Sequence, residues 1–214
     1  MNKTIIFSDI EGTILREADR SYSDEDMFNF LQSLNTLTEI KDSLCELHLV
    51  SPVSGTSMNN YIDKIDKNIR SFNKITGSQL PYIYRAYCAN NYDITVRLPS
   101  NIITTKAPTP NNYQSWKSIY VQEVCKNSRM KHPDDILDFI YFGNGRNDLR
   151  AMEIVQKFDG IAICPQNSRT AVKAIADFVG KSEDLRGITD GLNQYIKTLQ
   201  PPEQNVNKSI EPEK

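Results

Sequence analysis

The sequence predicts an α/β fold with a doubly wound parallel sheet, and three features of the chain indicate it. Short apolar runs with the composition of buried strands recur along the sequence. Segments whose apolar residues repeat at helical spacing lie between these runs. Polar clusters follow several of the runs, which is where ligands bind in open α/β sheets. Strands that alternate with helices form parallel sheets through crossover connections, so we expect one Rossmann-like domain.

The predicted strands are short and rich in β-branched and aromatic residues. They cover residues 4–7, 47–50, 80–84, 139–142 and 161–164. Residues 93–98 alternate between apolar and polar side chains, as a half-exposed strand does, whereas 99–112 are rich in Pro, Asn and Thr and are predicted as a loop. His48 lies inside the second run, and we interpret it as a core or strand-edge residue rather than a catalytic base.

The first predicted helix begins after Ser23, a residue type that caps helix N-termini. Three acidic residues follow it and suit the N-terminal dipole. Apolar residues then recur at helical spacing as far as Leu37, on the side that faces the sheet. Further helices are predicted over residues 56–72 and 113–125, through Val172 and Ile175, and over 192–199.

Length and charge restrict the classes of function. The 214 residues suit one domain with a small elaboration, and a formal net charge of −2 gives no reason to expect nucleic acid as a partner. No apolar run is long enough for a membrane span, and the chain enters a strand directly, without the pattern of a signal peptide. We expect a cytoplasmic protein by default, with export that needs no cleavable signal peptide as the alternative. The sequence indicates no particular oligomeric state.

The four cysteines exclude three kinds of site. They form no C-x-x-C pair and no Cys/His cluster, so neither a zinc site nor a disulfide framework is indicated. A cysteine-dependent phosphatase would need an arginine six positions after its nucleophile. The residues at that distance are Ser51, Ile94, Lys131 and Thr170, and none of them is an arginine.

The most informative segment follows the first predicted strand and reads Ser8-Asp9-Ile10-Glu11-Gly12-Thr13. Gly12 and Thr13 end the strand in a tight turn, which places Asp9 and Glu11 at its carboxyl end. Two carboxylates at this spacing can divide the work of phosphoryl transfer. Asp9 is then the candidate nucleophile, and Glu11 the candidate general acid and base.

Three further polar features follow in order along the chain. Ser51 comes directly after the second predicted strand, where its hydroxyl could hold phosphate oxygens. Lys117 lies near the start of a predicted helix and could neutralise charge on a phosphate. The segment Gly143–Asp148 follows the strand at 139–142. Its glycines allow close approach to a ligand, and its Asn and Asp side chains offer oxygen atoms to a hard cation.

In this order and spacing, the four features resemble the motifs of the haloacid dehalogenase (HAD) superfamily, a group of Mg²⁺-dependent phosphatases that form an aspartyl phosphate. The family pattern is a D-x-D-G-T strand end, a Ser or Thr at the next strand end, a Lys, and an acidic G-D-x-x-N-D loop. The segment from Ile163 through Asn167 to Asp177 is similar to the type II phosphatases of the superfamily. The resemblance covers residues 4 to about 198 and implies a hydrolase with a reduced cap.

The resemblance also implies a catalytic pair and a Mg²⁺ site. Asp9 would be the nucleophile and also a metal ligand. Glu11 would be the acid and base, with its backbone carbonyl toward the metal. Asn144 and Asp148 would complete the cation site.

Four residues would bind the substrate by the same resemblance. Ser51 and Lys117 would hold the phosphoryl group, together with Gly12 and Thr13 of the first motif. Lys106 is the alternative to Lys117. Lys117 is favoured because it opens a helix as the family lysine does, whereas Lys106 lies in the segment predicted as a loop.

Two positions depart from the family pattern. Glu11 replaces the usual second Asp, which keeps acid and base capacity but moves the carboxyl group by about one bond length. Asn144 replaces a metal-binding Asp, and its amide oxygen can bind Mg²⁺ but brings no negative charge. Asn144 therefore keeps open a function of another class, a binding module on this fold with an impaired metal site.

We predict a phosphatase domain over residues 1–198 with a small cap insertion at about 85–110, large enough for a β-hairpin or a small lobe, and a disordered tail or linker over 199–214. A small cap covers the site poorly, which favours a bulky substrate such as a phosphoprotein. Four aromatic residues could form a rim for a phosphotyrosine ring: Tyr84, Tyr87, Tyr92 and Trp116. The alternative is a small metabolite, a sugar or nucleotide phosphate, which would be favoured if the cap closes over the site.

Overall fold

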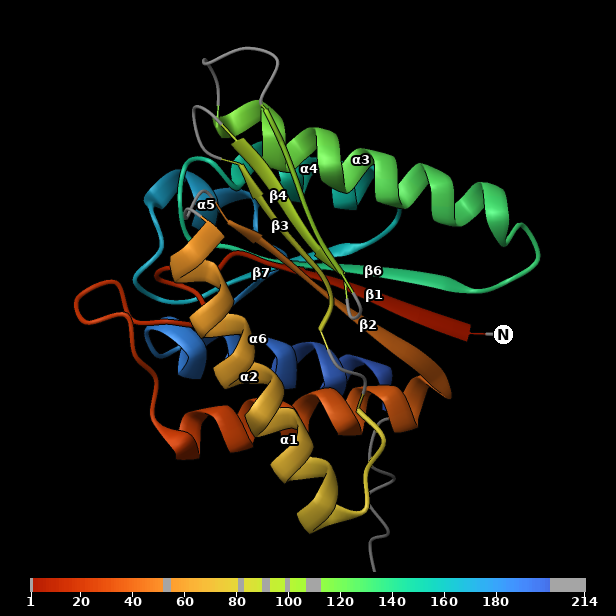
Figure 1. Ribbon diagram of the computed structural model, residues 1–214. Helices are drawn as coiled ribbons and strands as arrows, with labels where there is room; N and C mark the ends of the chain where they lie inside the picture. Colours follow the sequence, from red (N-terminus) through yellow and green to blue (C-terminus); the bar gives the residue numbers. More distant parts are fainter. Residues whose placement is uncertain are drawn as a thin grey trace, which may run out of the picture.

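The computed structural model describes residues 2–51, 55–80, 83–89, 93–98, 101–106 and 113–200, with side chains at 2–51, 59–80 and 116–200. Within these residues the centre of the molecule is an eight-stranded sheet in the order β5-β4-β3-β2-β1-β6-β7-β8. Figure 1 shows that helices cover both of its faces, with α3 and α4 on one side and α1, α2 and α6 on the other.

The strands are β1 (Asn2–Ser8), β2 (Ser43–Ser51), β3 (Ile83–Ala89), β4 (Asp93–Leu98), β5 (Asn101–Lys106), β6 (Leu137–Phe142), β7 (Ile161–Cys164) and β8 (Phe178–Val179). The helices are α1 (Asp24–Lys41), α2 (Gly55–Thr76), α3 (Tyr113–Lys131), α4 (Leu149–Lys157), α5 (Thr170–Ile175) and α6 (Asp184–Leu199). The predicted α/β class with a doubly wound parallel sheet is confirmed.

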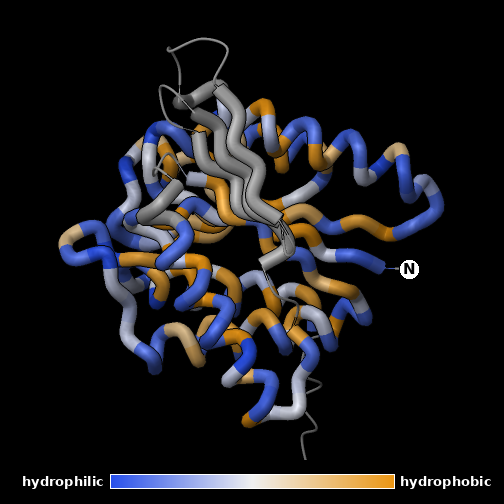
Figure 2. The backbone as a smooth tube through the Cα atoms, in the orientation of Figure 1, coloured by the Kyte–Doolittle hydropathy of each residue, from blue (hydrophilic) through white to orange (hydrophobic). Residues whose placement is uncertain are grey.

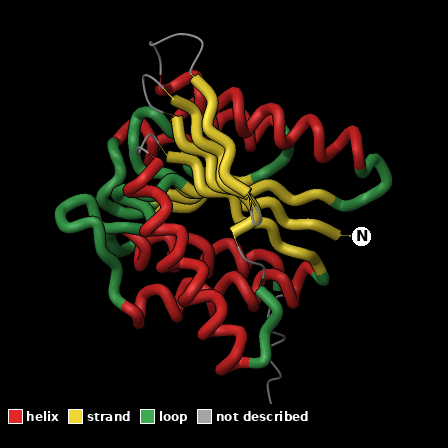
Figure 3. The backbone as a smooth tube through the Cα atoms, viewed as in Figure 1, coloured by secondary structure: helices red, strands yellow, loops and turns green. Residues whose placement is uncertain are grey.

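The pairing of the strands brings several of the predicted polar segments together. β1 lies between β2 and β6 and is parallel to both, and β7 is parallel to β6. The carboxyl ends of β2, β1, β6 and β7 therefore lie side by side at one edge of the sheet. Figure 3 shows the loops gathered at this edge, opposite the N-terminus of β1. Ser51, Asp9 and Gly143 each stand at or directly after one of these ends.

Two apolar cores hold the helices to the sheet, because successive strand residues point to opposite faces. Ile6 belongs to the core shared with α1, α2 and α6, and its neighbour Phe7 to the core shared with α3, α4 and α5. Figure 2 shows the hydrophobic residues concentrated in the strands and on the inner sides of the helices. His48 is 1% exposed and lies on the Phe7 side, as expected for a core histidine.

The first helix follows the sequence signals closely. The Oγ of Ser23 accepts a hydrogen bond of 3.0 Å from the backbone N–H of Asp26, so this serine is the cap that the sequence predicts. The apolar stripe of α1 is buried: Met27, Phe30, Leu31, Leu34 and Leu37. The N-terminus of α1 is thus fixed by Ser23, the last residue of the loop that connects β1 to α1.

The structure differs from the predicted elements in three places. Residues 101–106, predicted as part of a loop, form β5 and pair antiparallel with the whole of β4. The four central residues of β5 are all Ile or Thr, so the β-branched pattern prevails over the Pro-rich flanks. Two elements, α4 and β8, are absent from the predicted set.

The segment between β3 and α3 contains the predicted β-hairpin. β4 and β5 pair antiparallel, and β4 also pairs antiparallel with β3, so the hairpin continues the central sheet. The boundaries of a cap insertion at about 85–110 stay a prediction. Of the predicted tail, residues 201–214 lie outside the described residues. Among the helices that the structure describes, none is both long and apolar enough to cross a membrane.

Candidate active site

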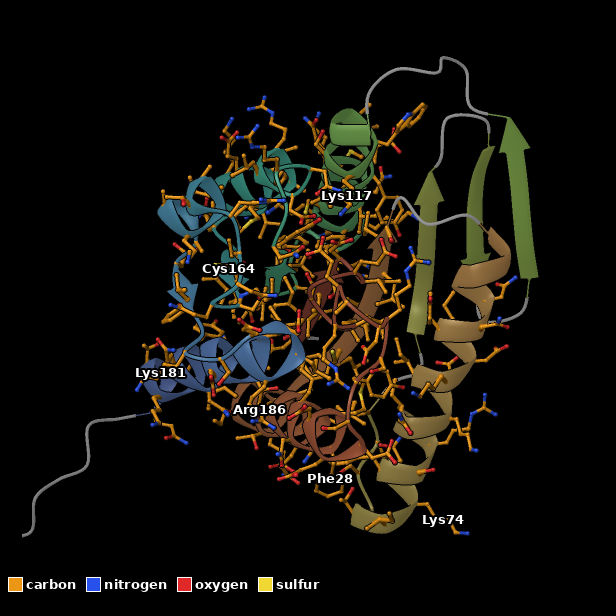
Figure 4. All side chains as sticks on the ribbon, turned by 90° about the vertical axis from the view of Figure 1, so that its left-hand side faces the viewer. Phe28, Lys74, Lys117, Cys164, Lys181 and Arg186 are labelled. Atoms are coloured by element: carbon orange, nitrogen blue, oxygen red, sulfur yellow. The ribbon has the colours of Figure 1, made fainter. Side chains whose placement is uncertain are left out.

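Asp9 lies at the carboxyl end of β1 and is almost fully buried, with 4% of its surface exposed. Its backbone N–H donates a hydrogen bond of 2.9 Å to the carbonyl of Phe142, so the end of β1 is joined to the end of β6. Figure 4 looks onto this edge and shows Lys117 between α3 and the ends of the strands. The candidate nucleophile is therefore held on rigid strands and faces a helix.

Lys117 connects the two acids of the site. Its Nζ lies 2.7 Å from Oδ1 of Asp9 and 2.7 Å from Oδ1 of Asp148, and the lysine itself is only 3% exposed. Asp9, Lys117 and Asp148 come from β1, α3 and the loop after β6, so they meet only in the folded chain. With both carboxyl groups ionised, this cluster of one buried cation and two buried anions carries one net negative charge.

Asp148 accepts hydrogen bonds on both carboxylate oxygens. Besides Lys117, its Oδ1 accepts one of 2.8 Å from the hydroxyl of Tyr141. Its Oδ2 accepts bonds of 3.1 and 2.9 Å from the backbone N–H groups of Asn144 and Gly145. An added Cβ at Gly143 would lie 2.7 Å from the Cβ of Asp148, so a glycine is needed for the loop to close around this carboxylate. Asp148 thus organises the loop and anchors Lys117.

Burial and charge shift the acid–base properties of this cluster. Burial raises the pKa of Asp9 to about 7; Lys117 counteracts this shift, and Asp148 adds to it. For Lys117, burial alone lowers the pKa, but Asp148 and Asp9 outweigh burial and raise the pKa above its ordinary value. The lysine therefore stays protonated, and Asp9 is the group of the pair that can change its charge near neutral pH.

The loop after β1 lies against the loop after β6. Gly12 has a φ of +70°, a conformation that favours glycine, and an added Cβ there would lie 2.0 Å from Nδ2 of Asn144. The hydroxyl of Thr13 donates a long hydrogen bond of 3.4 Å to Oδ1 of Asn144. The amide of Asn144 is thus packed against the loop that carries the first motif.

Glu11 and Ser51 differ in burial: Glu11 is partly exposed, whereas Ser51 is buried. The carboxylate of Glu11 forms an ion pair of 2.9 Å with Nε of Arg20, and its side chain is 29% exposed. Sequence reasoning did not identify Arg20, and no motif marks it. Ser51 is buried at the end of β2, the strand next to β1. Both residues thus lie at the same edge as Asp9, with Glu11 turned toward the loop of residues 16–21.

The donors available for a cation at this edge are oxygen atoms, the type that Mg²⁺ prefers. They are the carboxylates of Asp9 and Asp148, the amide of Asn144 and nearby backbone carbonyls. Among the described residues, no group of three or more His, Cys, Asp or Glu side chains is arranged to hold a metal ion. The donor set fits Mg²⁺ in kind, with Lys117 close to both carboxylates and the amide oxygen of Asn144 as a neutral third donor.

The remaining predicted residues lie elsewhere or outside the description. Lys106 ends β5, which is separated from β1 by β4, β3 and β2, whereas Lys117 contacts Asp9 directly. Of the four aromatic residues predicted as a rim, only the side chain of Trp116 is described, and it is partly buried. Tyr141, which contacts Asp148, was predicted only as part of a core strand. Its hydroxyl, buried next to a motif, is the signal that could have identified it.

Comparisons with known proteins show the fold. No family model matches the chain, and no curated protein matches it. Among solved structures, a haloacid dehalogenase-like hydrolase protein from Bacillus subtilis aligns with a TM-score of 0.52 at 15% identity, over 91% of this chain and 89% of that one. The 3-deoxy-D-manno-octulosonate 8-phosphate phosphatase from Yersinia pestis aligns with a TM-score of 0.51 at 10% identity, over 92% and 81%. The chain has the fold of these HAD-type hydrolases.

Proposed function

We propose that this protein is a Mg²⁺-dependent phosphomonoester hydrolase that acts through an aspartyl phosphate on Asp9. The observation that carries the proposal is the buried Asp9–Lys117–Asp148 cluster at the carboxyl edge of a parallel sheet. Ligands and chemistry gather at this edge in open α/β folds. A shared lysine beside a carboxylate nucleophile supplies positive charge where phosphoryl oxygens develop negative charge.

The reaction has two steps on the residues of this chain. Asp9 attacks phosphorus in line; a bond forms between its carboxylate oxygen and phosphorus, and the ester P–O bond breaks. Glu11 gives its proton to the leaving oxygen. Glu11 then takes a proton from water, which attacks the acyl phosphate and releases inorganic phosphate. For these proton transfers the carboxyl group of Glu11 has to turn from Arg20 toward the substrate.

The residues that would hold Mg²⁺ are Asp9, Asn144, Asp148 and the backbone carbonyl of Glu11. The ion supplies Lewis-acid stabilisation of the phosphoryl charge when it is bound. Asp148 would have to exchange one of its present hydrogen-bond donors to bind the ion, because it already accepts four. Asp9 and Asn144 are therefore the primary ligands in this proposal.

We further propose a small phosphorylated metabolite as the substrate, in place of the phosphoprotein that the reduced cap favoured. The Yersinia pestis neighbour is named for a small sugar phosphate, and no comparison offers support for a protein substrate. The rim of tyrosines on which the phosphotyrosine reading depended falls on side chains that the structure does not describe. A sugar or nucleotide phosphate is the better-supported class.

The first test is hydrolysis of p-nitrophenyl phosphate by the purified protein, with and without Mg²⁺. Asp9→Asn should abolish turnover while the protein stays folded. Asp159→Asn is the matched control, because Asp159 is an exposed acid in an ion pair with Arg129 and should have no effect. Turnover that survives in Asp9→Asn would remove Asp9 from the role of nucleophile.

A second assay separates the substrate classes. Sugar and nucleotide monophosphates should give values of kcat/KM well above those of phosphotyrosine peptides. The reverse order would restore the phosphoprotein reading. Absence of turnover with every divalent metal, together with retained binding of phosphate, would instead favour the alternative of a binding module, for which the neutral Asn144 is the supporting feature.

A further inference from the structure

Helix α3 makes a second buried polar contact with the sheet, less than one turn beyond Lys117. The hydroxyl of Tyr120 lies 2.8 Å from Nδ1 of His48, and both side chains are buried. Lys117 and Tyr120 are three residues apart, so they leave the helix on the same face. The face of α3 that reaches Asp9 is thus tied to β2 as well as to β1.

His48 belongs to a row of rings that crosses three strands. The register places His48 beside Phe7, and Phe7 beside Tyr141. The centroid of Phe7 lies 5.2 Å from that of His48 and 6.4 Å from that of Tyr141, and it meets Tyr120 edge-on at 6.4 Å. One end of the row bonds to Tyr120, and the other end, through Tyr141, bonds to Asp148. The row therefore contacts Tyr120, which lies on the same helix as Lys117, and Asp148, which forms an ion pair with Lys117.

The other nitrogen of His48 is also held. Its Nε2 lies 3.4 Å from Oε2 of Glu46, and Oε1 of Glu46 accepts a hydrogen bond of 2.7 Å from Nζ of Lys3. Lys3 and Glu46 stand on β1 and β2, so the imidazole is oriented by groups on the sheet itself. The ring that Tyr120 contacts is therefore also oriented by a group on the sheet.

The hydrogen bond between Tyr120 and His48 can fix the position of α3 more closely than apolar packing can. Val121 and Cys125 of α3 belong to the apolar core on this face of the sheet, and apolar contacts do not specify direction. A hydrogen bond specifies both distance and angle. A shift of the helix by about 1 Å would be felt at the reacting atoms, where misplacement of that size can cost two orders of magnitude in rate.

We propose that His48 and Tyr120 are positioning residues that hold α3 where the ammonium group of Lys117 lies between Asp9 and Asp148. The inference deepens the proposed function and rests on it for the catalytic role of Lys117. The geometric part of it, the position of Lys117, can be measured without any turnover.

Four variants test it. Tyr120→Phe removes one oxygen atom and keeps the ring in the core. His48→Val removes the partner of that oxygen, whereas His48→Asn keeps a polar atom near the position of Nδ1. Tyr22→Phe is the control, because Tyr22 is also buried and its hydroxyl accepts a hydrogen bond of 2.8 Å from Asn68, but it belongs to the core on the opposite face of the sheet.

The readouts are the exchange of the Lys117 ammonium protons with water, followed by ¹⁵N NMR, and kcat for p-nitrophenyl phosphate. Tyr120→Phe and His48→Val should each accelerate the exchange and lower kcat by about tenfold. His48→Asn should restore values near those of the parent, and Tyr22→Phe should change neither. A merely structural role would not make the Lys117 signal follow this pattern.

The outcomes separate the two proposals. Unchanged exchange in folded Tyr120→Phe and His48→Val would overturn the positioning role. Accelerated exchange in both variants, in a parent protein that hydrolyses no phosphomonoester, would support the positioning role and overturn the proposed function.

Discussion

The ammonium group of Lys117 lies 2.7 Å from Oδ1 of Asp148, an oxygen that also accepts a hydrogen bond of 2.8 Å from Tyr141. The pair is fully buried, and the second oxygen of Asp148 is satisfied by two backbone N–H groups. One carboxylate therefore joins α3, β6 and the loop after β6. The stability of the fold and the geometry of the candidate site depend on the same side chain.

Asp148→Asn should destabilise the protein strongly. The substitution removes the negative charge that pairs with Lys117 and places an NH₂ group or a neutral oxygen against donors that need an anion. Loss of one partner of a buried pair costs about 3 to 5 kcal/mol. Chemical denaturation measures the change. In Asp159→Asn, whose carboxylate is 90% exposed, the loss should stay below about 0.5 kcal/mol. Equal losses in the two variants would contradict the role given to Asp148.

The substitution Lys117→Met should lower the free energy of unfolding by more at pH 8 than at pH 5. The folded-state pKa of Asp9, raised mainly by burial to about 7, lies above its unfolded value of 3.8. The folded state therefore holds this proton more tightly, and the contribution of Asp9 to stability falls as the pH rises from about 4 to 7. Without the lysine, the pKa of Asp9 rises further and the loss extends above pH 7. Urea denaturation of both proteins at the two pH values measures the difference.

The control for that series is Lys41→Met, which removes a half-buried ion pair with Asp138 on β6. It should cost less than about 1 kcal/mol. A deficit in Lys117→Met that stays constant or shrinks toward pH 8 would show that Asp9 does not carry the buried charge.

Gly12→Ala should be far more damaging than Gly77→Ala, although both glycines have a positive φ, of +70° and +75°. An added Cβ at Gly77 meets nothing within 4 Å, so only backbone strain of about 1 kcal/mol is expected. At Gly12 the Cβ would lie 2.0 Å from Nδ2 of Asn144. Gly12→Ala should therefore lower the unfolding temperature more than Gly77→Ala does, and it alone should reduce turnover. The difference between the two variants reports how much the contact between the two loops contributes. Asn144→Ala should recover part of the stability of Gly12→Ala.

Asn144→Asp should tighten the binding of Mg²⁺ by about tenfold or more, because a carboxylate adds a charge that the amide lacks. Isothermal titration calorimetry measures the affinity without any substrate. The metal-free variant should be less stable than the parent, since a further carboxylate then stands near Asp9. An unchanged affinity would place the cation away from Asn144.

Much of the site could be predicted from local sequence because its chemistry is carried by short motifs at strand ends. The parallel order of the strands follows from the alternation of strand and helix, and this order alone brings Asp9, Ser51 and Gly143 to one edge. Lys117 could be preferred over Lys106 from its place at the start of a helix, and it is Lys117 that contacts Asp9. The strand at 101–106 was missed because Pro and Asn dominate the composition of 99–112, although the four central residues of the strand are β-branched. It forms because β4 offers it a hydrogen-bonding edge.

By itself, the sequence determined the fold class, the strands at the centre of the sheet and the residue types that meet at its carboxyl edge, because strand and helix periodicities and strand-end motifs are local properties. Only the tertiary structure decided how those residues share their charges. The assignment of Lys117 to both Asp9 and Asp148, the saturation of Asp148 by Tyr141 and two backbone groups, and the pairing of Glu11 with Arg20 depend on distances between segments far apart in the chain. The strength of a charge interaction is set by separation and burial, and neither is written in the spacing of residues along a sequence.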